Sequence, residues 1–549
     1  MTDKTINESD SKPKPDGPRP MKRILLLNPS ARVFLFPDGT PVQRKHCPPP
    51  LGLAYIAASL LERHYEVKIV DVMAEGYDNE YVHEDSITYG LDFSKIVKRV
   101  KLEEPDIIAI TVMFTYIIAD ILELCAILKE EFPKSKIVLG GPHPSATPID
   151  CMKDRNIDFV IIGEGDISMT MLMDSLNGMM PMESVPSLYY RLNGEIKSTL
   201  DDSKAVISGK GWNYYRRRDT GIPDKIDDLP YPAWHLFPMQ AYWNASVRSG
   251  GGDALRNRYA PMVSTRGCLH ACYFCTSPLL AGYKGFQRRS NEDIVGEIRW
   301  LVENFDVKEI HFNDENFLCN RQQAKVLLKI LAEEFPVLCF QVVAGLEVNA
   351  IDEETVDLMA AANFSKICLA VESGDPELQD AVINKRVKLH RIPKLVEYIK
   401  KKGIEIRGLF MIGFPDESRE QIEKTIALAK GLEFDELYIA IVTPLPGTPL
   451  YDLCIDQNLF IQADRKERMR FSAACLKLPD VGPDKLEEIR RRVWQENFKR
   501  QKNMEKNRIV KDRFREYKDV SDYQRVGFVA ENKQHSINPS LPLKNRRND

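Results

Sequence analysis

The sequence predicts an α/β protein built from two parallel-sheet domains and a helical C-terminal region. At 549 residues, the chain is long enough for more than one hydrophobic core. Short apolar segments alternate with stretches of helical spacing in two separate series, which is typical of βα units. Three cysteines, Cys268, Cys272 and Cys275, directly follow the first apolar segment of the second series. The cysteines, which are the strongest candidates for a chemical role, therefore lie at the end of a predicted strand of the second sheet.

Composition narrows the function classes. The net charge of −4 gives no general reason to expect a nucleic acid or membrane partner. Eleven cysteines, an odd number, disfavour a disulfide framework and favour a reducing compartment, so we expect a cytoplasmic protein. The polar residues 1–21 predict a disordered leader, since they contain no apolar signal segment. The sequence contains no run of about 18 uncharged apolar residues, so we expect no membrane-spanning helix.

The first series of segments predicts a doubly wound, Rossmann-like parallel sheet. The expected strands are residues 22–28, 66–71, 107–113, 136–139 and 159–162, and the expected helices are 51–63, 93–100 and 116–132. We expect 73–91 to be a loop. Such an alternation places helices on both faces of the sheet.

Ligands of open parallel sheets bind beyond the carboxyl ends of the strands. In the first series these ends carry small or polar residues: Asn28, Thr111, Thr115, Gly140, Gly141, Gly163 and Glu164. Glycines there allow a ligand to approach the backbone closely. Spacing alone equally allows these residues to be simple turn residues.

The segment after the first series predicts a connection between the domains. Residues 188–196 have the pattern of a hairpin with an Asn-Gly turn. Residues 227–234 are punctuated by prolines, as in an extended segment that enters a new domain. Trp212, Tyr214, Tyr215, Trp234, Tyr242 and Trp243 are concentrated here, and we expect them to pack between the domains.

The second series predicts six strand–helix units. A strand before the cysteines is followed by strands at 308–312, 338–343, 366–371, 405–412 and 436–442, with helices at 291–305, 321–334, 353–362, 391–402 and 419–432. Six units indicate a partial (β/α)6 barrel rather than a complete eight-fold barrel, and chemistry in such barrels gathers at the C-terminal strand ends. Asp314, Glu315 and Glu372 follow strands, and Arg407 lies within the fifth.

The spacing C-x3-C-x2-C favours an iron–sulfur cluster. A four-iron cluster normally takes four thiolate ligands, so three cysteines leave one iron open to another ligand. The alternative is a Cys3His zinc site that includes His270, but structural zinc sites usually divide their ligands between two separated pairs. We interpret the other eight cysteines as core residues.

The segment 265–275, with Phe274 before the last cysteine, resembles the signature loop of the radical S-adenosylmethionine (SAM) superfamily. This resemblance implies a [4Fe-4S] cluster held by Cys268, Cys272 and Cys275, with Phe274 beside the cofactors. It further implies that Asp314 faces the methionyl end of SAM and that Glu372, next to Ser373, binds the ribose. Arg407 is then a candidate for the SAM carboxylate.

The motifs Pro48-Pro49-Pro50-Leu51-Gly52-Leu53, Gly140 to Pro144 and Gly163-Glu164-Gly165 resemble the cobalamin-binding domain that precedes the barrel in one radical SAM subfamily. The D-x-H-x-x-G motif of other cobalamin proteins is absent, which implies a cobalt without a histidine ligand from this segment; His143 is a poor substitute. The implied organisation is a leader (1–21), a cobalamin-binding domain (22–170), a linker with a hairpin (171–255), a radical SAM barrel (256–455), a helical region (456–520) and a polar tail (521–549).

By resemblance, the expected activity is C-methylation of an unactivated carbon through a 5′-deoxyadenosyl radical and methylcobalamin. Oxidative ring closure or ring rearrangement shares every motif, and a cobalamin-binding or redox-sensing regulator is an alternative of another class. The expected partners are a small-molecule or peptide substrate and an electron donor such as flavodoxin or ferredoxin, without nucleic acid. A tRNA methylthiotransferase is disfavoured because no all-β pattern follows the barrel. The basic stretch 484–517 predicts a solvated helix, with anion or nucleic acid binding as the less favoured alternative.

Overall fold

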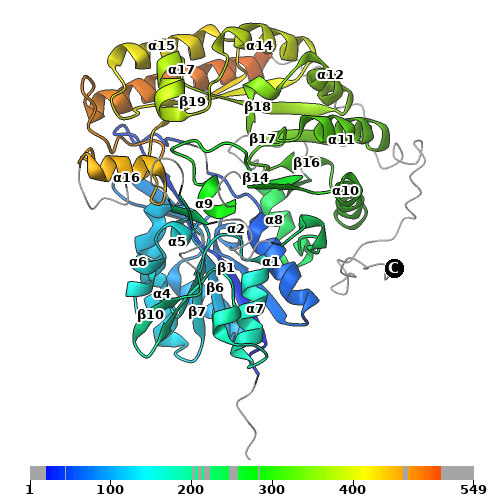
Figure 1. Cartoon of the computed structure of the whole chain (residues 1–549), viewed down its shortest axis with the longest axis vertical. Coiled ribbons are helices and arrows are strands. Elements are labelled where there is room, and N and C mark those ends of the chain that lie inside the picture. The colour runs from blue at the N-terminus through cyan, green and yellow to red at the C-terminus, as the bar shows by residue number, and fades with distance from the viewer. Residues whose placement is uncertain are drawn as a thin grey trace, which may run out of the picture.

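The computed structural model describes residues 20–43, 45–200, 205–207, 213–215, 223–245, 258–281, 285–461 and 468–507. The expected leader, apart from residues 20 and 21, lies outside these ranges, as do the expected polar tail and Trp212. Two sheets dominate the described fold, and Figure 1 shows the N-terminal sheet below and the second sheet above. No helix in the described residues is both long and apolar enough to cross a membrane.

The N-terminal sheet has seven strands in the order β10-β9-β8-β7-β6-β1-β3. Its five parallel strands are β1 (Arg23–Asn28), β3 (Glu66–Asp71), β6 (Ile107–Thr111), β7 (Lys136–Gly140) and β8 (Phe159–Ile161). β1 is an almost entirely buried apolar run, because the sheet is covered on both faces. The predicted doubly wound parallel sheet is confirmed.

The N-terminal half has seven helices in the described residues, of which α1, α3 and α4 match the three that were predicted and the other four were not predicted. They are α1 (Leu51–Glu62), α2 (Val72–Glu75), α3 (Phe93–Glu103), α4 (Ile118–Glu131), α5 (Pro142–Ala146), α6 (Pro148–Lys153) and α7 (Asp166–Leu176). Asp92 caps α3 by accepting a hydrogen bond from the Lys95 backbone N–H. A short 3-10 turn, η1 (Thr115–Ile117), precedes α4.

Two predictions for this half were wrong. The stretch 73–91 is not a loop: β4 (Glu80–Val82) and β5 (Ser86–Tyr89) pair with β2 (Ala31–Phe34) in a small antiparallel sheet. The predicted hairpin exists as β9 (Leu188–Leu192) and β10 (Glu195–Ser198), but β9 pairs with β8. The hairpin therefore extends the N-terminal sheet instead of belonging to a linker, and a boundary at residue 170 would divide α7.

The second sheet has six parallel strands in chain order. They are β13 (Tyr259–Met262), β16 (Glu309–Phe312), β17 (Cys339–Glu347), β18 (Phe364–Glu372), β19 (Glu405–Ile412) and β20 (Glu436–Ile441). Their connecting helices are α10 (Asn291–Phe305), α11 (Arg321–Glu334), α12 (Glu353–Ala361), α14 (Ile392–Lys401) and α15 (Arg419–Gly431). All six predicted strands are present, and β13 and β20 remain the two edges.

Smaller elements complete the fold. The cysteine segment is entered through β14 (Thr265–Gly267), which pairs with β15 (Phe286–Arg288) around α9 (Ser277–Ala281). Short segments α8 (Met239–Asn244), α13 (Pro376–Leu378), β11 (Ala205–Ile207) and β12 (Asn213–Tyr215) lie in connections. The chain then forms α16 (Pro449–Asp456) and α17 (Pro483–Asn507), and α17 packs on β20.

One hydrophobic core runs through both halves. It joins one face of the N-terminal sheet to the second sheet through the buried aromatic side chains Trp234, Tyr242 and Trp243. The prediction that these aromatics pack between the domains is therefore confirmed for these three residues. The shared core fixes the two sets of strand ends relative to one another.

Candidate functional site

The cysteine segment is anchored at its start by Asp314, which follows β16. The Asp314 carboxylate accepts hydrogen bonds from the Ser264 and Thr265 backbone N–H groups at 3.0 and 2.5 Å and from both hydroxyls at 2.6 Å. Burial raises the pKa of Asp314, and these hydrogen bonds oppose the rise. Asp314 thus lies beneath the cysteine segment with its oxygens engaged, and a direct contact of this side chain with SAM remains a prediction.

Backbone donors hold two of the three thiols. The His270 N–H lies 3.4 Å from the Cys268 Sγ, and the Ser277 N–H lies 3.4 Å from the Cys275 Sγ. Burial raises the pKa of Cys272 to about 12 and that of Cys275 to about 11, so a metal must displace the thiol protons. The donors favour the thiolates that iron requires.

The geometry argues against the zinc alternative. Zn–S bonds are about 2.3 Å long, so two thiolates on one ion lie within about 5 Å of one another. Within the described ranges, which include all three cysteines, no group of three His, Cys, Asp or Glu side chains is placed to hold a single metal ion. His270 instead bonds Glu347, with 2.8 Å between Nε2 and Oε2.

The residues expected to contact SAM do not all lie together: Glu372 lies at the end of a strand and Phe274 in the cysteine segment, whereas Arg407 lies in another part of the sheet. Glu372 ends β18 with a left-handed φ of 67° and forms an ion pair with Lys385 at 2.8 Å, while Phe274 packs against Phe414. Such a strained non-glycine residue persists only where its surroundings hold it. Arg407 lies elsewhere, near the start of β19, where its Nε is 3.1 Å from the Glu436 Oε2.

Ser373 is buried, and its hydroxyl bonds the Thr425 hydroxyl at 3.2 Å and accepts from the Asp375 N–H. These bonds fix the turn after Glu372. Roles for Phe274, Glu372, Ser373 and Arg407 in binding SAM stay predictions.

A cavity of about 990 Å³ lies between the strand ends of the N-terminal half and residues of the second half. Its N-terminal wall contains six of the seven residues expected to bind cobalamin, and only Thr115 is missing from it: the six are Asn28, Thr111, Gly140, Gly141, Gly163 and Glu164. Its other wall contains Arg266, Asn313, Glu315, Val343 and Arg407 from the second half. Both halves therefore face one shared space.

Thr115 is the exception among the residues expected to bind cobalamin. It is buried, and its hydroxyl lies 3.1 Å from the His143 Nδ1. The other ring nitrogen of His143 lies 3.2 Å from the Thr147 hydroxyl. Thr115 thus holds His143 instead of lining the cavity, and His143 has both nitrogens engaged, which agrees with its rejection as a cobalt ligand.

Glycines keep the N-terminal wall open. A Cβ added at Gly140 would have only the Ile161 carbonyl within 4 Å, at 3.8 Å, and one at Gly52 would have no neighbour. Side chains at these positions would therefore take up space in the cavity. Gly141 has a φ of +100°, which other residues rarely adopt. This wall fits a large ring that approaches the backbone closely.

An ionic bridge connects the two walls. Arg266 lies two residues before Cys268, and its Nη1 is 2.7 Å from both the Glu164 Oε2 and the Asp166 Oδ2. The Arg266 guanidinium also lies 4.6 Å from the ring of Tyr55 in α1. The cluster segment is thereby tied to the Gly163-Glu164-Gly165 turn of the N-terminal half.

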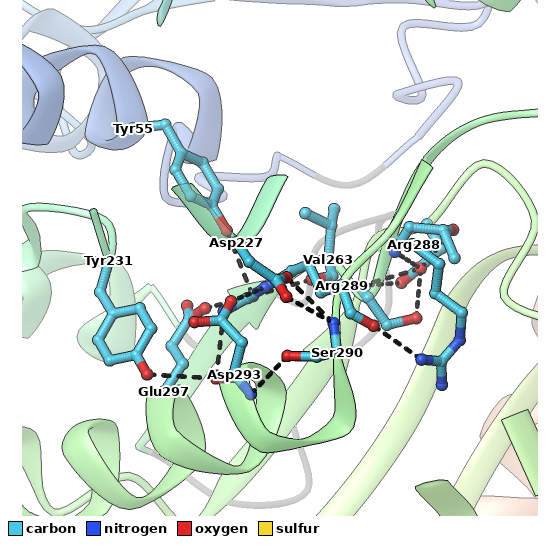
Figure 2. A network of polar contacts seen from close by, with 12 residues as sticks. Tyr55, Asp227, Tyr231, Val263, Arg288, Arg289, Ser290, Asp293 and Glu297 are labelled. Carbon is cyan, nitrogen blue, oxygen red and sulfur yellow. Dashed lines mark hydrogen bonds and ion pairs between the residues drawn. The ribbon is translucent and has the colours of Figure 1, made fainter. Parts of the chain in front are cut away.

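A second contact between the halves runs through Arg289, and Figure 2 shows Tyr55 pointing toward this network. The Tyr55 hydroxyl lies 3.4 Å from the Arg289 Nη1, which also donates to the Val263 carbonyl. Asp293 and Glu297, both on α10, form ion pairs with Arg289. Each cation is thus compensated, as a buried arginine requires.

The sequence interpretation did not identify Tyr55, Arg266 or Arg289. Arg266 lies inside the cysteine motif, so its position was a usable signal. Its acidic partners lie about one hundred residues earlier in the chain, and no local spacing relates the two segments.

Two family models match the chain. The B12 binding domain matches residues 42–172, and the Radical SAM superfamily matches residues 262–429. An uncharacterized methyltransferase of Pyrococcus horikoshii is 30% identical over 443 residues, which is 80% of this chain and 84% of that protein. The cytidylyl-2-hydroxyethylphosphonate methyltransferase of Streptomyces wedmorensis is 29% identical, covering 85% and 88%.

The fold also resembles the radical SAM methyltransferase TsrM of Kitasatospora setae, solved with cobalamin and a [4Fe-4S] cluster. The TM-score is 0.60 at 16% identity, covering 81% of this chain and 79% of that one. A more distant relative is the anaerobic magnesium-protoporphyrin IX monomethyl ester cyclase of Rubrivivax gelatinosus, 22% identical over 80% of this chain and 71% of that protein.

The cysteine segment, the shared cavity and these matches define the class: the protein is a radical SAM enzyme that uses a [4Fe-4S] cluster, SAM and cobalamin. More particularly, the chain belongs to the family of B12-binding radical SAM enzymes whose relatives are named as methyltransferases.

Proposed function

We propose that the protein transfers a methyl group from SAM, by way of cobalamin, to an unactivated carbon of a small-molecule or peptide substrate. The observation that carries this proposal is the cavity that residues of both halves line together. A methyl carrier and a radical source must both reach the substrate, and one shared space allows it.

When bound, the cluster and SAM supply a radical that removes hydrogen from carbon, and cobalamin supplies the methyl carrier. The chain's own residues position these groups. Cys268, Cys272 and Cys275 bind the cluster, while Asp314 and Arg266 fix the segment that carries them. Glu372 and Lys385 place a charged pair beside Cys272.

The electron for this chemistry comes from a partner such as flavodoxin or ferredoxin. We place the protein in the cytoplasm, because none of the eleven cysteines forms a disulfide and a reducing compartment favours that state.

The test uses anaerobically reconstituted protein, methyl-labelled SAM and a chemical reductant. We expect the label to appear on bound cobalamin and then on the product. Cobalamin that binds without becoming labelled would favour the second candidate, oxidative ring closure, which the relationship to the Rubrivivax cyclase supports. Binding of all three cofactors without any consumption of SAM would instead favour a regulator.

A further inference from the structure

Two arginines, Arg470 and Arg490, lie in the wall of the cavity near β20 and α17. Arg490 is only 3% exposed. Its Nε donates to the Ile439 carbonyl at 3.1 Å, and its side chain bonds the Tyr438 side chain. Its Nη1 has no hydrogen-bond partner in the described residues, and Arg490 forms no ion pair with any carboxylate among them. The basic stretch 484–517 was predicted to be solvated, so this burial is a departure.

A buried guanidinium without a carboxylate is costly, because an arginine side chain cannot shed its charge as other groups can. Burial lowers the pKa of Arg490 and also that of Arg470, in agreement with the sparse hydrogen bonding of the Arg490 guanidinium. The Arg470 guanidinium lies 3.6 Å from the Phe34 ring centroid, and its acidic neighbour Asp85, at 3.4 Å, is largely exposed. An exposed pair of this kind contributes little.

The acidic groups at this end of the cavity are engaged elsewhere. Glu436 forms ion pairs with both Arg407 and Lys366, so two cations already share this carboxylate. Asp435 accepts a hydrogen bond from the Ile406 backbone N–H at 2.9 Å. Glu487, whose charge acts on both arginines, is itself paired with Arg468 at 2.7 Å. The two arginines are therefore not neutralised by these carboxylates.

Aromatic side chains surround the arginines. Tyr116 packs edge-on against Phe34 at 5.3 Å and stacks on Phe114 at 5.2 Å, and Trp494 lies 5.5 Å from Phe36. Phe34, Phe114, Tyr116 and Trp494 all line the cavity. This end of the cavity thus combines positive charge with apolar surface.

We propose that Arg470 and Arg490 bind a phosphate or phosphonate group of the substrate, while the aromatic side chains contact its less polar part. Guanidinium groups bind such oxyanions with paired, charge-assisted hydrogen bonds, and a dianion can compensate two arginines at once. The inference rests on the proposed function in one respect: it takes the occupant of this end to be the substrate. The arginines come from the second half, whereas the residues expected to bind cobalamin come from the first.

The test titrates cobalamin-loaded protein with inorganic phosphate and with methylphosphonate at constant ionic strength, using acetate as the comparison. Trp494 in the wall serves as a fluorescent reporter. We expect saturable binding of both phosphorus oxyanions, weakened about tenfold or more in Arg490→Gln because a charge-assisted hydrogen bond is lost. Arg492→Gln, an exposed neighbour on α17, is the matched control and should bind as the natural protein does.

Equal phosphate affinity in Arg490→Gln and the natural protein would overturn the proposal, as would acetate binding as tightly as phosphate. Loss of cobalamin from Arg490→Gln would show that Arg490 binds the cofactor, and this result would also overturn the proposal. Arg470→Gln should show the same weakening, and it decides the matter if Arg490→Gln does not fold. Phosphate binding that persists while cobalamin remains unlabelled would count against methyl transfer alone.

Discussion

A fourth cysteine, Cys319, lies beside Cys268 at the candidate cluster site, although it is outside the C-x3-C-x2-C segment. The sequence interpretation placed Cys319 in the core, yet this half-buried thiol lies in the turn after β16 and bonds the Cys268 thiol. That hydrogen bond lowers the pKa of Cys268. Cys319 therefore acts on a cluster ligand without belonging to the motif, and it offers a control for the ligand assignment.

We expect Cys268→Ala, Cys272→Ala and Cys275→Ala each to reduce bound iron to near zero, because each removes one of the three thiolates expected to hold the cluster. Cys319→Ala should retain the iron and the visible absorbance of the cluster. Iron content and absorbance after anaerobic reconstitution measure both. Retention of a complete cluster in any of the first three variants would refute the assignment.

Glu417 is a fully buried carboxyl in the turn that follows β19. Its Oε2 accepts hydrogen bonds from the Gly413 and Phe414 backbone N–H groups at 2.5 and 3.0 Å, while its Oε1 has no partner in the described residues. Burial raises the pKa of Glu417 to about 7. Phe414 packs on Phe274, so this turn supports the cysteine segment.

The folded protein keeps the Glu417 proton up to about pH 7, whereas the unfolded chain loses it near pH 4.5. Between these values the folded state binds more protons, so stability falls as pH rises. Glu417→Gln keeps the acceptor oxygen without a charge. It should therefore stabilise the protein by up to about 3 kcal/mol at pH 8 and hardly at pH 4.5.

Urea unfolding at both pH values measures this difference. Glu420→Gln, an exposed change in the first turn of α15, should show no comparable dependence on pH. A Glu417→Gln effect that is the same at pH 4.5 and pH 8 would contradict the explanation.

At the scale of elements, β14 is the connection between the cluster segment and the N-terminal half. Arg266 extends from this strand to Glu164 and Asp166, and removing it leaves two largely buried carboxylates without their cation. We expect Arg266→Gln to lower the free energy of unfolding by about 3–5 kcal/mol. Arg258→Gln removes an exposed ion pair with Asp306 and should cost less than about 1 kcal/mol.

Arg266 is a positioning residue, so a second measurement separates positioning from stability. Arg266→Gln should bind a full cluster but show a lower ratio of label on cobalamin to SAM consumed. Arg266→Lys should recover part of this ratio. An unchanged ratio in Arg266→Gln would limit the bridge to a structural role.

The strands and helices were predictable where apolar spacing was regular. The six strands of the second sheet follow buried apolar runs, and five helices lie where the spacing indicated them. The stretch 73–91 was missed because β4 and β5 have only three and four residues, and their stability comes from pairing with each other and with β2. Local pattern likewise could not reveal that β9 pairs with β8.

At the scale of the molecule, a single core and a shared cavity make the two halves one folding unit. Cobalamin at 100 times its Kd stabilises the state that binds it by about 2.7 kcal/mol. Because the core is continuous through Trp234 and Tyr242, we expect one calorimetric transition that shifts upward as a whole. Two transitions, of which only one shifts with cobalamin, would show that the halves unfold separately.

The candidate site was predictable to the extent that its residues follow strands. Gly140, Gly163 and Glu164 line the cavity as their strand-end positions indicated. Thr115 and Asp314 also follow strands, but their side chains bond other parts of the protein. Arg490 was missed because a basic helix is usually solvated, and burial depends on β20 packing beneath it.

The bonds of Asp314 with Ser264 and Thr265 have a consequence for the biogenesis of the holoenzyme. They join amino acids only, so we expect the entrance of the ligand segment to form without iron. We therefore expect the apoprotein to fold before the cluster binds, unlike small metal domains that fold only around their ion. A chelator should strip the cluster and leave the scaffold native, and a cluster donor should refill it without a refolding step.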